Sequence, residues 1–228
     1  MAVHPNNQRN IDLIKSIIIE EEYPNFIDII YKSIVNQKKS LPIILDFAGV
    51  STNFDSRIKD AAHEYFTADI NKFEKIDFVF DLCDKTTIPK NLIGKFDNVI
   101  ALAILEHVWH PFKAAENLVS LLNKEKSSKL WLFAPFLYPY HAPDSLIYQD
   151  YFRFTRDSWA VLFPTAKQIK ISPIRGRATT ALLVGIPKYK AFEKKVPFFK
   201  KIFNNLNKLF SKRDNQSQVS GYCVTIDF

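Results

Sequence analysis

The sequence 96-FDNVIALAILEHVWHP-111 decides the fold class of this protein. Residues 99–105 form an uninterrupted apolar run, which stops at the polar pair Glu106 and His107. A segment that is apolar on both faces is typical of a central strand in a parallel sheet, covered by helices on either side. The polar pair then falls at the carboxyl end of the strand, the edge at which open α/β sheets bind ligands. The stretch therefore predicts an α/β protein with a binding site beside residues 106 and 107.

The composition is typical of a globular protein. The chain has 228 residues, of which 47% are hydrophobic, and this is enough for a sizeable core. No apolar run approaches the ~18 residues of a membrane span, and the first residues are too polar for a signal peptide. Cys83 and Cys223 are far apart and fit a reducing compartment better than a disulfide framework. We expect a single domain over residues 1–228 and a cytoplasmic location.

Short apolar runs on either side of the opening stretch supply the other strands of the sheet. Their alternation with helical segments predicts a doubly wound, Rossmann-like, mostly parallel sheet of seven strands with helices on both faces. Right-handed crossovers would bring the carboxyl ends of the parallel strands to one edge. Besides residues 99–105, the expected strands are 42–47, 65–70, 76–82, 130–136, 167–173 and 221–228.

Three segments are predicted to be helical from the spacing of their apolar residues. Residues 6–37 form a leading helix or helix pair, interrupted at Pro24, within an N-terminal cover over residues 1–40. This cover would pack on the sheet or on the ligand crevice, and we favour plain core packing. A second helix is expected over residues 56–64. A third, amphipathic helix begins with Pro111 at its first position.

Three carboxylates are expected at the ends of three successive strands: Asp46, Asp69 and Asp81. A single acid in such a place often serves only in a turn or a helix cap, whereas three in register indicate a ligand site. Asp69 lies twenty residues after Gly49, about the interval at which nucleotide-binding folds place an acid on the ribose hydroxyls. Asp81 would accept from an adenine amine, and Asp46 would face an ammonium group. The expected ligand therefore has a ribose, an adenine and a cationic end.

The motif series ILDFAGVST, YFTADI, FVFDL and FDNVIALAILEHV resembles that of class I S-adenosylmethionine (SAM)-dependent methyltransferases. The most specific piece is FDxVxxxxxLEHV, followed by proline and an amphipathic helix. The stretch PFLYPYHAPDSLIYQDYFRFT resembles a subgroup associated with polysaccharide or cell-envelope biosynthesis. The resemblance covers residues 40–175. It implies SAM as cofactor, methyl transfer to a small or lipid-linked, sugar-containing acceptor, and a last strand that runs antiparallel between the fifth and the sixth.

The resemblance implies a cofactor site at the ends of the first four strands. Its first turn departs from the family pattern acid-x-Gly-x-Gly-x-Gly, because the glycine positions carry Ala48, Val50 and Thr52. The β-branched Val50 resists positive φ angles. A non-catalytic methyltransferase-like module with a degenerate turn is therefore the alternative hypothesis, and a nicotinamide oxidoreductase is disfavoured because no G-x-G-x-x-G occurs. The implied cofactor-binding residues are Asp46, Ala48, Gly49, Asp69, Ile70, Asp81, Leu82 and Leu102.

The acceptor would lie beyond the fourth and fifth strands. His141 is the best candidate for a general base, because a neutral imidazole can take up a proton near pH 7, but it could equally order its loop. Glu106 and His107 are further catalytic candidates, with helix entry as the alternative role. No metal site is expected. The residues expected to hold the acceptor are Tyr138, Tyr140, Asp150, Tyr151 and Arg153, the last with a structural ion pair as alternative.

The basic charge of the protein is concentrated in an insertion expected over residues 174–220, before the last strand. The net charge is +7, and residues 186–213 hold nine Lys or Arg against one acid. A basic amphipathic helix over residues 196–213 could lie on an anionic membrane, here at the inner membrane face. We favour docking on its own domain or on a second subunit of a homo-oligomer. Nucleic acid is not expected as a partner, because the charge is local and no reader motif occurs.

Overall fold

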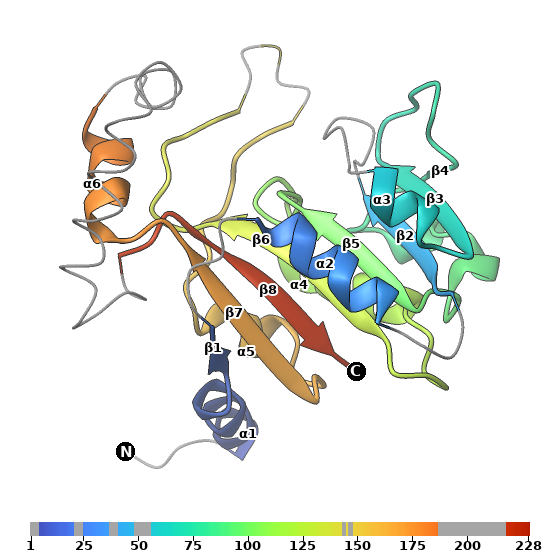
Figure 1. Cartoon of the computed structure of the whole chain (residues 1–228), viewed down its shortest axis with the longest axis horizontal. Helices are drawn as coiled ribbons and strands as arrows, with labels where there is room; N and C mark the ends of the chain where they lie inside the picture. The colour runs from blue at the N-terminus through green and yellow to red at the C-terminus, as the bar shows by residue number, and fades with distance from the viewer. Residues whose placement is uncertain are drawn as a thin grey trace.

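A central mixed sheet of eight strands organises the protein, in the order β1-β7-β8-β6-β5-β2-β3-β4 (Figure 1). The structure is a computed structural model, and it describes residues 5–20, 25–36, 41–47, 56–142, 145, 148–186 and 218–228. The predicted first turn at residues 48–55, with Ala48 and Gly49, lies outside these residues. So does the predicted basic helix over residues 196–213.

The strands confirm the predicted α/β class. They are β1 (Ile18–Ile19), β2 (Ile43–Phe47), β3 (Glu64–Asp69), β4 (Phe78–Val79), β5 (Asn98–Leu102), β6 (Lys129–Pro135), β7 (Gln168–Ile174) and β8 (Gly221–Asp227). The pairs among β2 to β6 are all parallel. Seven of the eight strands fall on the segments expected from the sequence, although several are shorter than expected.

The last strand, β8, runs antiparallel to both of its neighbours, β6 and β7. The placement implied by the family resemblance is therefore confirmed. Gly221 begins this strand opposite Pro135 and Ile174. A Cβ atom on Gly221 would lie 2.7 Å from the backbone oxygen of Ala134, so the close approach of β8 to β6 at this end requires glycine.

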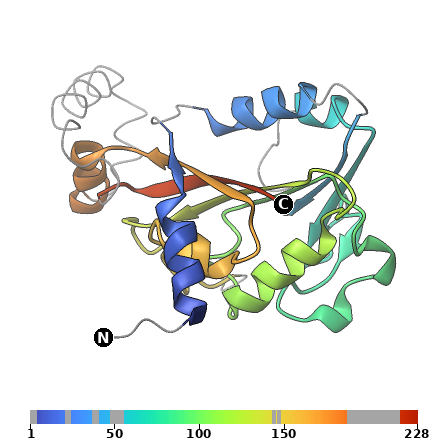
Figure 2. The same ribbon diagram turned by 90° about the horizontal axis from the view of Figure 1, so that it is seen from below.

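Helices cover both faces of the sheet (Figure 2). One face carries α2 (Phe26–Val35) and α3 (Ser56–Asp60), and the other carries α1 (Pro5–Lys15), α4 (Pro111–Leu121) and α5 (Ser158–Leu162). Each layer has its own apolar core against the sheet. Helix α6 (Arg177–Gly185) follows β7, and two short 3-10 helices lie at Lys85–Thr87 and Lys90–Leu92. Among the described residues, no helix is long and apolar enough to cross a membrane.

The prediction of continuous helix in the leading segment is wrong around Ile18 and Ile19. These two residues form β1, which pairs in parallel with β7 at Lys170 and Ile171. The backbone N–H of Glu20 extends the pairing by donating to the oxygen of Ile171 at 2.9 Å. A run of β-branched isoleucines suits a strand, and the free edge of β7 supplies the hydrogen bonds that decide the outcome. The strand also carries the chain from α1 on one face to α2 on the other.

The prediction that the fourth strand reaches Leu105 is also wrong. Strand β5 ends at Leu102, because Ala103 takes a left-handed conformation with φ of 57°. The chain then turns and buries Leu105 in the core. The third expected strand, 76–82, is reduced to β4, so Asp81 lies beyond a strand end that comes two residues earlier. The second expected helix ends at Asp60 rather than at residue 64.

Candidate active site at the carboxyl edge

The first predicted site residue, Asp46, lies in β2 in register with Thr67 of β3 and Ile100 of β5. Its side chain is only 1% exposed. The hydroxyl of Tyr65 donates to its Oδ2 atom at 2.6 Å. Burial raises the pKa of Asp46 to about 7, and the hydrogen bond from Tyr65 opposes this shift in part. The pKa of Tyr65 is raised too, chiefly by burial and then by the charge of the Asp46 carboxyl group.

The second and third acids, Asp69 and Asp81, order the turns that follow their strands. Oδ1 of Asp69 accepts from the backbone N–H of Asn71 at 2.8 Å. Oδ1 of Asp81 accepts from the N–H of Cys83 at 2.7 Å. These are the turn contacts that a lone acid commonly makes. Each contact uses one oxygen, so the second oxygen of each carboxylate is chemically able to accept from a ligand.

The apolar residues predicted beside the cofactor differ in their exposure. Ile70 is 61% exposed, and Leu102 is half-buried at the end of β5. Leu82 is 5% exposed and packs in the main core, while its backbone oxygen accepts from the side-chain amide of Asn117 at 2.8 Å. The side chain of Leu82 is therefore part of the core and is covered by other core residues.

The charged end of the opening stretch, Glu106, is fully buried. Neither of its carboxylate oxygens has a hydrogen-bond partner among the described residues. Its backbone oxygen accepts from the N–H groups of Tyr151 and Phe152 at 2.8 and 3.2 Å, which fixes the returning loop above it. Burial, and secondarily the charge of Asp150, raises the pKa of Glu106 to about 8. Helix entry does not explain this residue, because α4 starts at Pro111 with His110 as its cap.

Two histidines lie against this carboxyl group. Nε2 of His107 is 3.8 Å from Oε1 of Glu106, and Nδ1 of His107 contacts the backbone oxygen of Gln149 at 2.5 Å. The rings of His107 and His141 meet edge to face, with centroids 4.9 Å apart. Burial lowers the pKa of His107, so its imidazole is neutral at pH 7. The structure thus joins all three predicted catalytic candidates in one cluster, although they come from two different loops.

The loop of His141 is held by the pair Asp150 and Arg153. Arg153 donates through both terminal nitrogens to the two oxygens of Asp150, and it also donates to the backbone oxygens of Tyr138, Pro139 and Phe152. These contacts engage all five N–H donors of the guanidinium group. The hydrogen bonds from Arg153 lower the pKa of Asp150 to about 2. Both residues were predicted to hold the acceptor, with a structural ion pair as the alternative for Arg153, and in the structure they form such a pair within the loop.

Aromatic side chains surround the histidine cluster. Tyr148 lies over His107 with ring centroids 4.5 Å apart, and Tyr138 meets His141 edge to face at 5.3 Å. Tyr140 and Tyr151 are 70% and 50% exposed, so their rings are open to a ligand. Three of these tyrosines were predicted to hold the acceptor, and Tyr148 was missed. Its place in the same loop, three residues before Tyr151, was the available signal.

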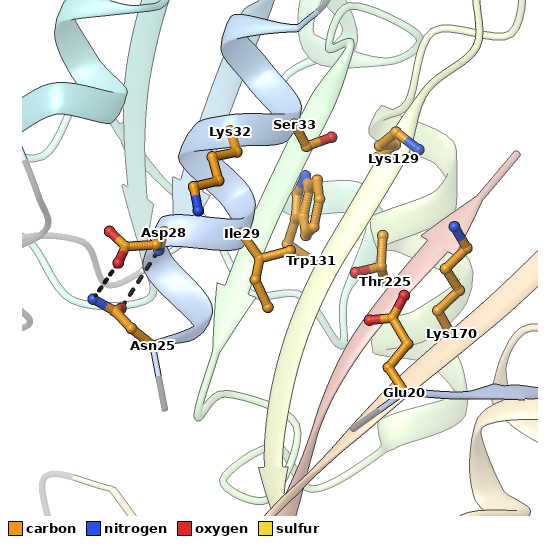
Figure 3. A pocket seen from close by; sticks show the side chains of 10 residues that line it. All are labelled: Glu20, Asn25, Asp28, Ile29, Lys32, Ser33, Lys129, Trp131, Lys170 and Thr225. Atoms are coloured by element: carbon orange, nitrogen blue, oxygen red, sulfur yellow. Dashed lines mark hydrogen bonds between the residues drawn. The ribbon is translucent and has the colours of Figure 1, made fainter. Parts of the chain in front are cut away.

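A separate pocket of about 520 Å³ lies between α2 and strands β6, β7 and β8 (Figure 3). Its lining includes Lys129 at the start of β6 and Lys170 near the start of β7, so it opens near the amino ends of these strands. Glu20 and Thr225 complete this side, and Trp131 forms the floor. None of the predicted site residues lines it. The chemistry at the carboxyl edge and this pocket are therefore two different places.

No protein-family model and no curated protein matches the sequence. Among solved structures, a SAM-dependent methyltransferase from Archaeoglobus fulgidus matches with a TM-score of 0.51 at 14% identity, over 89% of this chain and 94% of that chain. The 1,6-didemethyltoxoflavin-N1-methyltransferase of Burkholderia thailandensis, solved with 1,6-didemethyltoxoflavin and S-adenosylhomocysteine (SAH), gives 0.48 at 11% identity, over 88% and 77%. A methyltransferase-like protein from Bacillus halodurans gives 0.48 at 10%, over 89% and 96%. The first likeness shows that this chain has the Rossmann-like fold of SAM-dependent methyltransferases.

Proposed function

We propose that the protein is an enzyme that transfers the methyl group of SAM to an acceptor bound beside Glu106, His107 and His141. The proposal is carried by one observation. The sheet has the methyltransferase type of fold, and three acids at or just beyond strand ends lie on the same carboxyl edge as a cluster of buried Glu106 and half-buried His107 and His141. When bound, SAM would supply an activated methyl group on a sulfonium, so the protein has only to bind, align and exclude water.

The chain's own acids fit the three polar parts of SAM. Asp46 would pair with the ammonium group, and its raised pKa means that it gives up a proton when that cation arrives. Asp69 would accept from the ribose hydroxyls with the oxygen that its turn leaves available. Asp81 would accept from the adenine amine in the same way. Leu102 and the exposed Ile70 would offer apolar contact to the nucleoside.

The acceptor is proposed to be a small or lipid-linked molecule that contains a sugar. Support comes from the exposed rings of Tyr140, Tyr151 and the newly placed Tyr148, together with Trp109, which is 59% exposed. Tyrosine and tryptophan combine an apolar face, which can pack on the C–H face of a sugar ring, with a polar group for its hydroxyls. Proton removal from the acceptor is assigned to the cluster of Glu106, His107 and His141.

Calorimetric titration of the protein with SAH tests the cofactor assignment. We expect binding by the wild type and a 10- to 100-fold weaker affinity for Asp69→Ala, about 1.4–3 kcal/mol, because a charged acceptor of two hydroxyl donors is lost. Asp60→Ala, at the exposed end of α3, is the matched control and should bind as the wild type does. Absence of SAH binding at millimolar concentration would refute methyl transfer and favour the non-catalytic module.

A further inference from the structure

We propose that Glu106, His107 and His141 form a binding site for a divalent transition-metal ion of the zinc class. One donor atom from each residue lies within 4.8 Å of the other two. Zinc binds imidazole nitrogens and carboxylate oxygens at about 2.0–2.2 Å, which sets the donors roughly 3–3.5 Å from one another. Closure onto an ion therefore asks for side-chain movements on the order of 1 Å. This inference does not depend on the proposed methyl transfer.

The buried carboxyl group of Glu106 is the strongest sign of a missing partner. It is fully buried, and both of its oxygens lack a hydrogen-bond donor among the described residues. An unpartnered polar group in the interior destabilises the folded state, and a charged one does so more strongly. Nε2 of His107 lies 3.8 Å from Oε1 of Glu106. A cation between these atoms would satisfy the carboxylate.

His107 is oriented as a metal ligand usually is. A ligating histidine commonly gives its second ring nitrogen to a carbonyl or a carboxylate, which fixes the tautomer and the ring orientation. Nδ1 of His107 contacts the oxygen of Gln149 at 2.5 Å, which leaves Nε2 for an ion. Nδ1 of His141 is buried 3.0 Å from Oδ2 of Asp150 but has no hydrogen-bond partner among the described residues.

The support for His141 is itself rigid. The backbone N–H of His141 donates to Oδ2 of Asp150 at 2.9 Å, so that carboxylate fixes the backbone of His141 and lies 3.0 Å from Nδ1 of its ring. Arg153 fixes Asp150 in turn through two parallel contacts. An outer shell of this kind is typical of built metal sites, in which ligand orientation is set before the ion arrives.

The donor set indicates which ion would bind. Two imidazoles and one carboxylate suit zinc, iron, cobalt or nickel, whereas magnesium and calcium prefer oxygen donors alone. Three protein ligands leave at least one coordination position open. If the proposed methyl transfer holds, an acceptor hydroxyl in that position would lose its proton more readily, since a bound cation lowers the pKa of coordinated water and hydroxyls.

Direct metal titration of the chelator-treated full-length protein tests the site. We expect one Zn²⁺ per chain by calorimetry, and a visible absorption spectrum of low-symmetry Co²⁺ that grows to one equivalent. Glu106→Gln and His141→Asn should each weaken Zn²⁺ affinity at least 100-fold, because a ligand is lost. Glu116→Gln on the exposed face of α4 and the exposed His63→Asn are matched controls that should bind as the wild type does.

The outcomes separate this site from the proposed cofactor site. SAH titration in parallel reports the cofactor half, so loss of one kind of binding does not hide the other. A circular dichroism spectrum of each metal-free variant establishes that it is folded. Wild-type protein that binds neither Zn²⁺ nor Co²⁺ above the level of a ligand-free reference protein would overturn the proposal. So would folded Glu106→Gln and His141→Asn variants that bind Zn²⁺ as tightly as the wild type.

Discussion

Asp46 and Glu106 are two buried acids at the same edge of the sheet, and among the described residues only Asp46 has a side-chain hydrogen-bond partner. Asp46 accepts a 2.6 Å hydrogen bond from Tyr65, whereas both oxygens of Glu106 lack a donor among the described residues. Burial raises the pKa of both carboxyl groups, to about 7 and about 8. A partnered acid can be explained by the folded chain alone. An unpartnered one points to something that the chain binds.

The contrast separates the two halves of the candidate site. In the half around Asp46, the phenol of Tyr65 donates to the buried carboxyl group, and we propose that this carboxyl group receives a cation from the ligand. The half around Glu106 places two histidines beside the acid, and Nδ1 of His107 contacts the backbone oxygen of Gln149. Both arrangements fit a sheet edge that binds charged ligands. They predict that the stability of the protein responds differently to metal, to pH and to mutation in the two halves.

The largest expected effect is metal stabilisation of the Glu106 half. Zn²⁺ at 100 to 1,000 times its dissociation constant should raise the free energy of unfolding by about 3–4 kcal/mol. Glu106→Gln should lose this gain, while Asp46→Asn should keep it, because the two acids serve separate ligands. Urea unfolding with and without Zn²⁺ measures both. An equal gain in Glu106→Gln and the wild type would break the contrast.

A smaller effect is expected from pH on the Asp46 half. The folded state keeps the proton of Asp46 up to about pH 7, whereas the ordinary pKa of an aspartate is 3.8. The free energy of unfolding therefore falls as the pH rises from about 4 to about 7, since the raised pKa contributes stability that is lost over that range. Asp46→Asn, which mimics the protonated form, should gain on the order of 2–3 kcal/mol relative to the wild type between pH 5 and pH 8.

Urea unfolding of both proteins at the two pH values checks this expectation. Asp157→Asn, in an exposed ion pair with Arg156, is the control and should differ little from the wild type. If the stability of Asp46→Asn relative to the wild type does not change with pH, burial does not hold the proton on Asp46. Asp46 would then not differ from Glu106 in the way proposed, because its carboxyl group would not be held in the protonated form.

Breaking the outer shell of the Glu106 half should have a comparable but slightly smaller effect. Arg153→Ala removes both charge-assisted hydrogen bonds from Asp150, whose side chain is covered, and should cost about 2 kcal/mol of stability. It should also weaken Zn²⁺ binding, because His141 loses its orientation. Arg156→Ala, whose exposed pair with Asp157 is screened by solvent, should cost less than about 1 kcal/mol. Thermal unfolding and Zn²⁺ titration of the two variants test this, and equal losses in both variants would contradict the prediction.

The smallest expected effect comes from removing the partner of Asp46. Tyr65→Phe deletes the phenol donor and should cost about 1–2 kcal/mol, because a buried carboxyl then lacks its hydrogen bond. The pKa of Asp46 should rise further, since the contact with Tyr65 lowers it. Tyr140→Phe, on a ring that is 70% exposed, should change stability by less than about 0.5 kcal/mol. If the Tyr65→Phe protein is as stable as the wild type, the hydrogen bond from Tyr65 does not stabilise Asp46, and the comparison with Glu106 loses its basis.

Much of the fold follows from local patterns in the sequence. The runs around Leu45, Val99 and Trp131 predict strands because each is continuously apolar, and the structure confirms β2, β5 and β6. The two-residue strand β1 was not predicted, because its isoleucines fit helical spacing as well as strand propensity. Only the open edge of β7 decides between the two. The end of β5 was predicted three residues too late, because nothing in the sequence shows that Ala103 adopts a positive φ angle.

The α/β class, the three acids near strand ends and the presence of Glu106, His107 and His141 in two separate stretches could be read from the sequence. The packing of the chain was needed to show that these three side chains meet, that Arg153 pairs with Asp150, and that the Glu106 carboxyl group has no hydrogen-bond partner among the described residues. The physical reason is that strand and helix formation depend on neighbours in the chain. Burial and hydrogen-bond satisfaction depend instead on the packing of segments that can be distant in the chain, as His141 is thirty-five positions from Glu106.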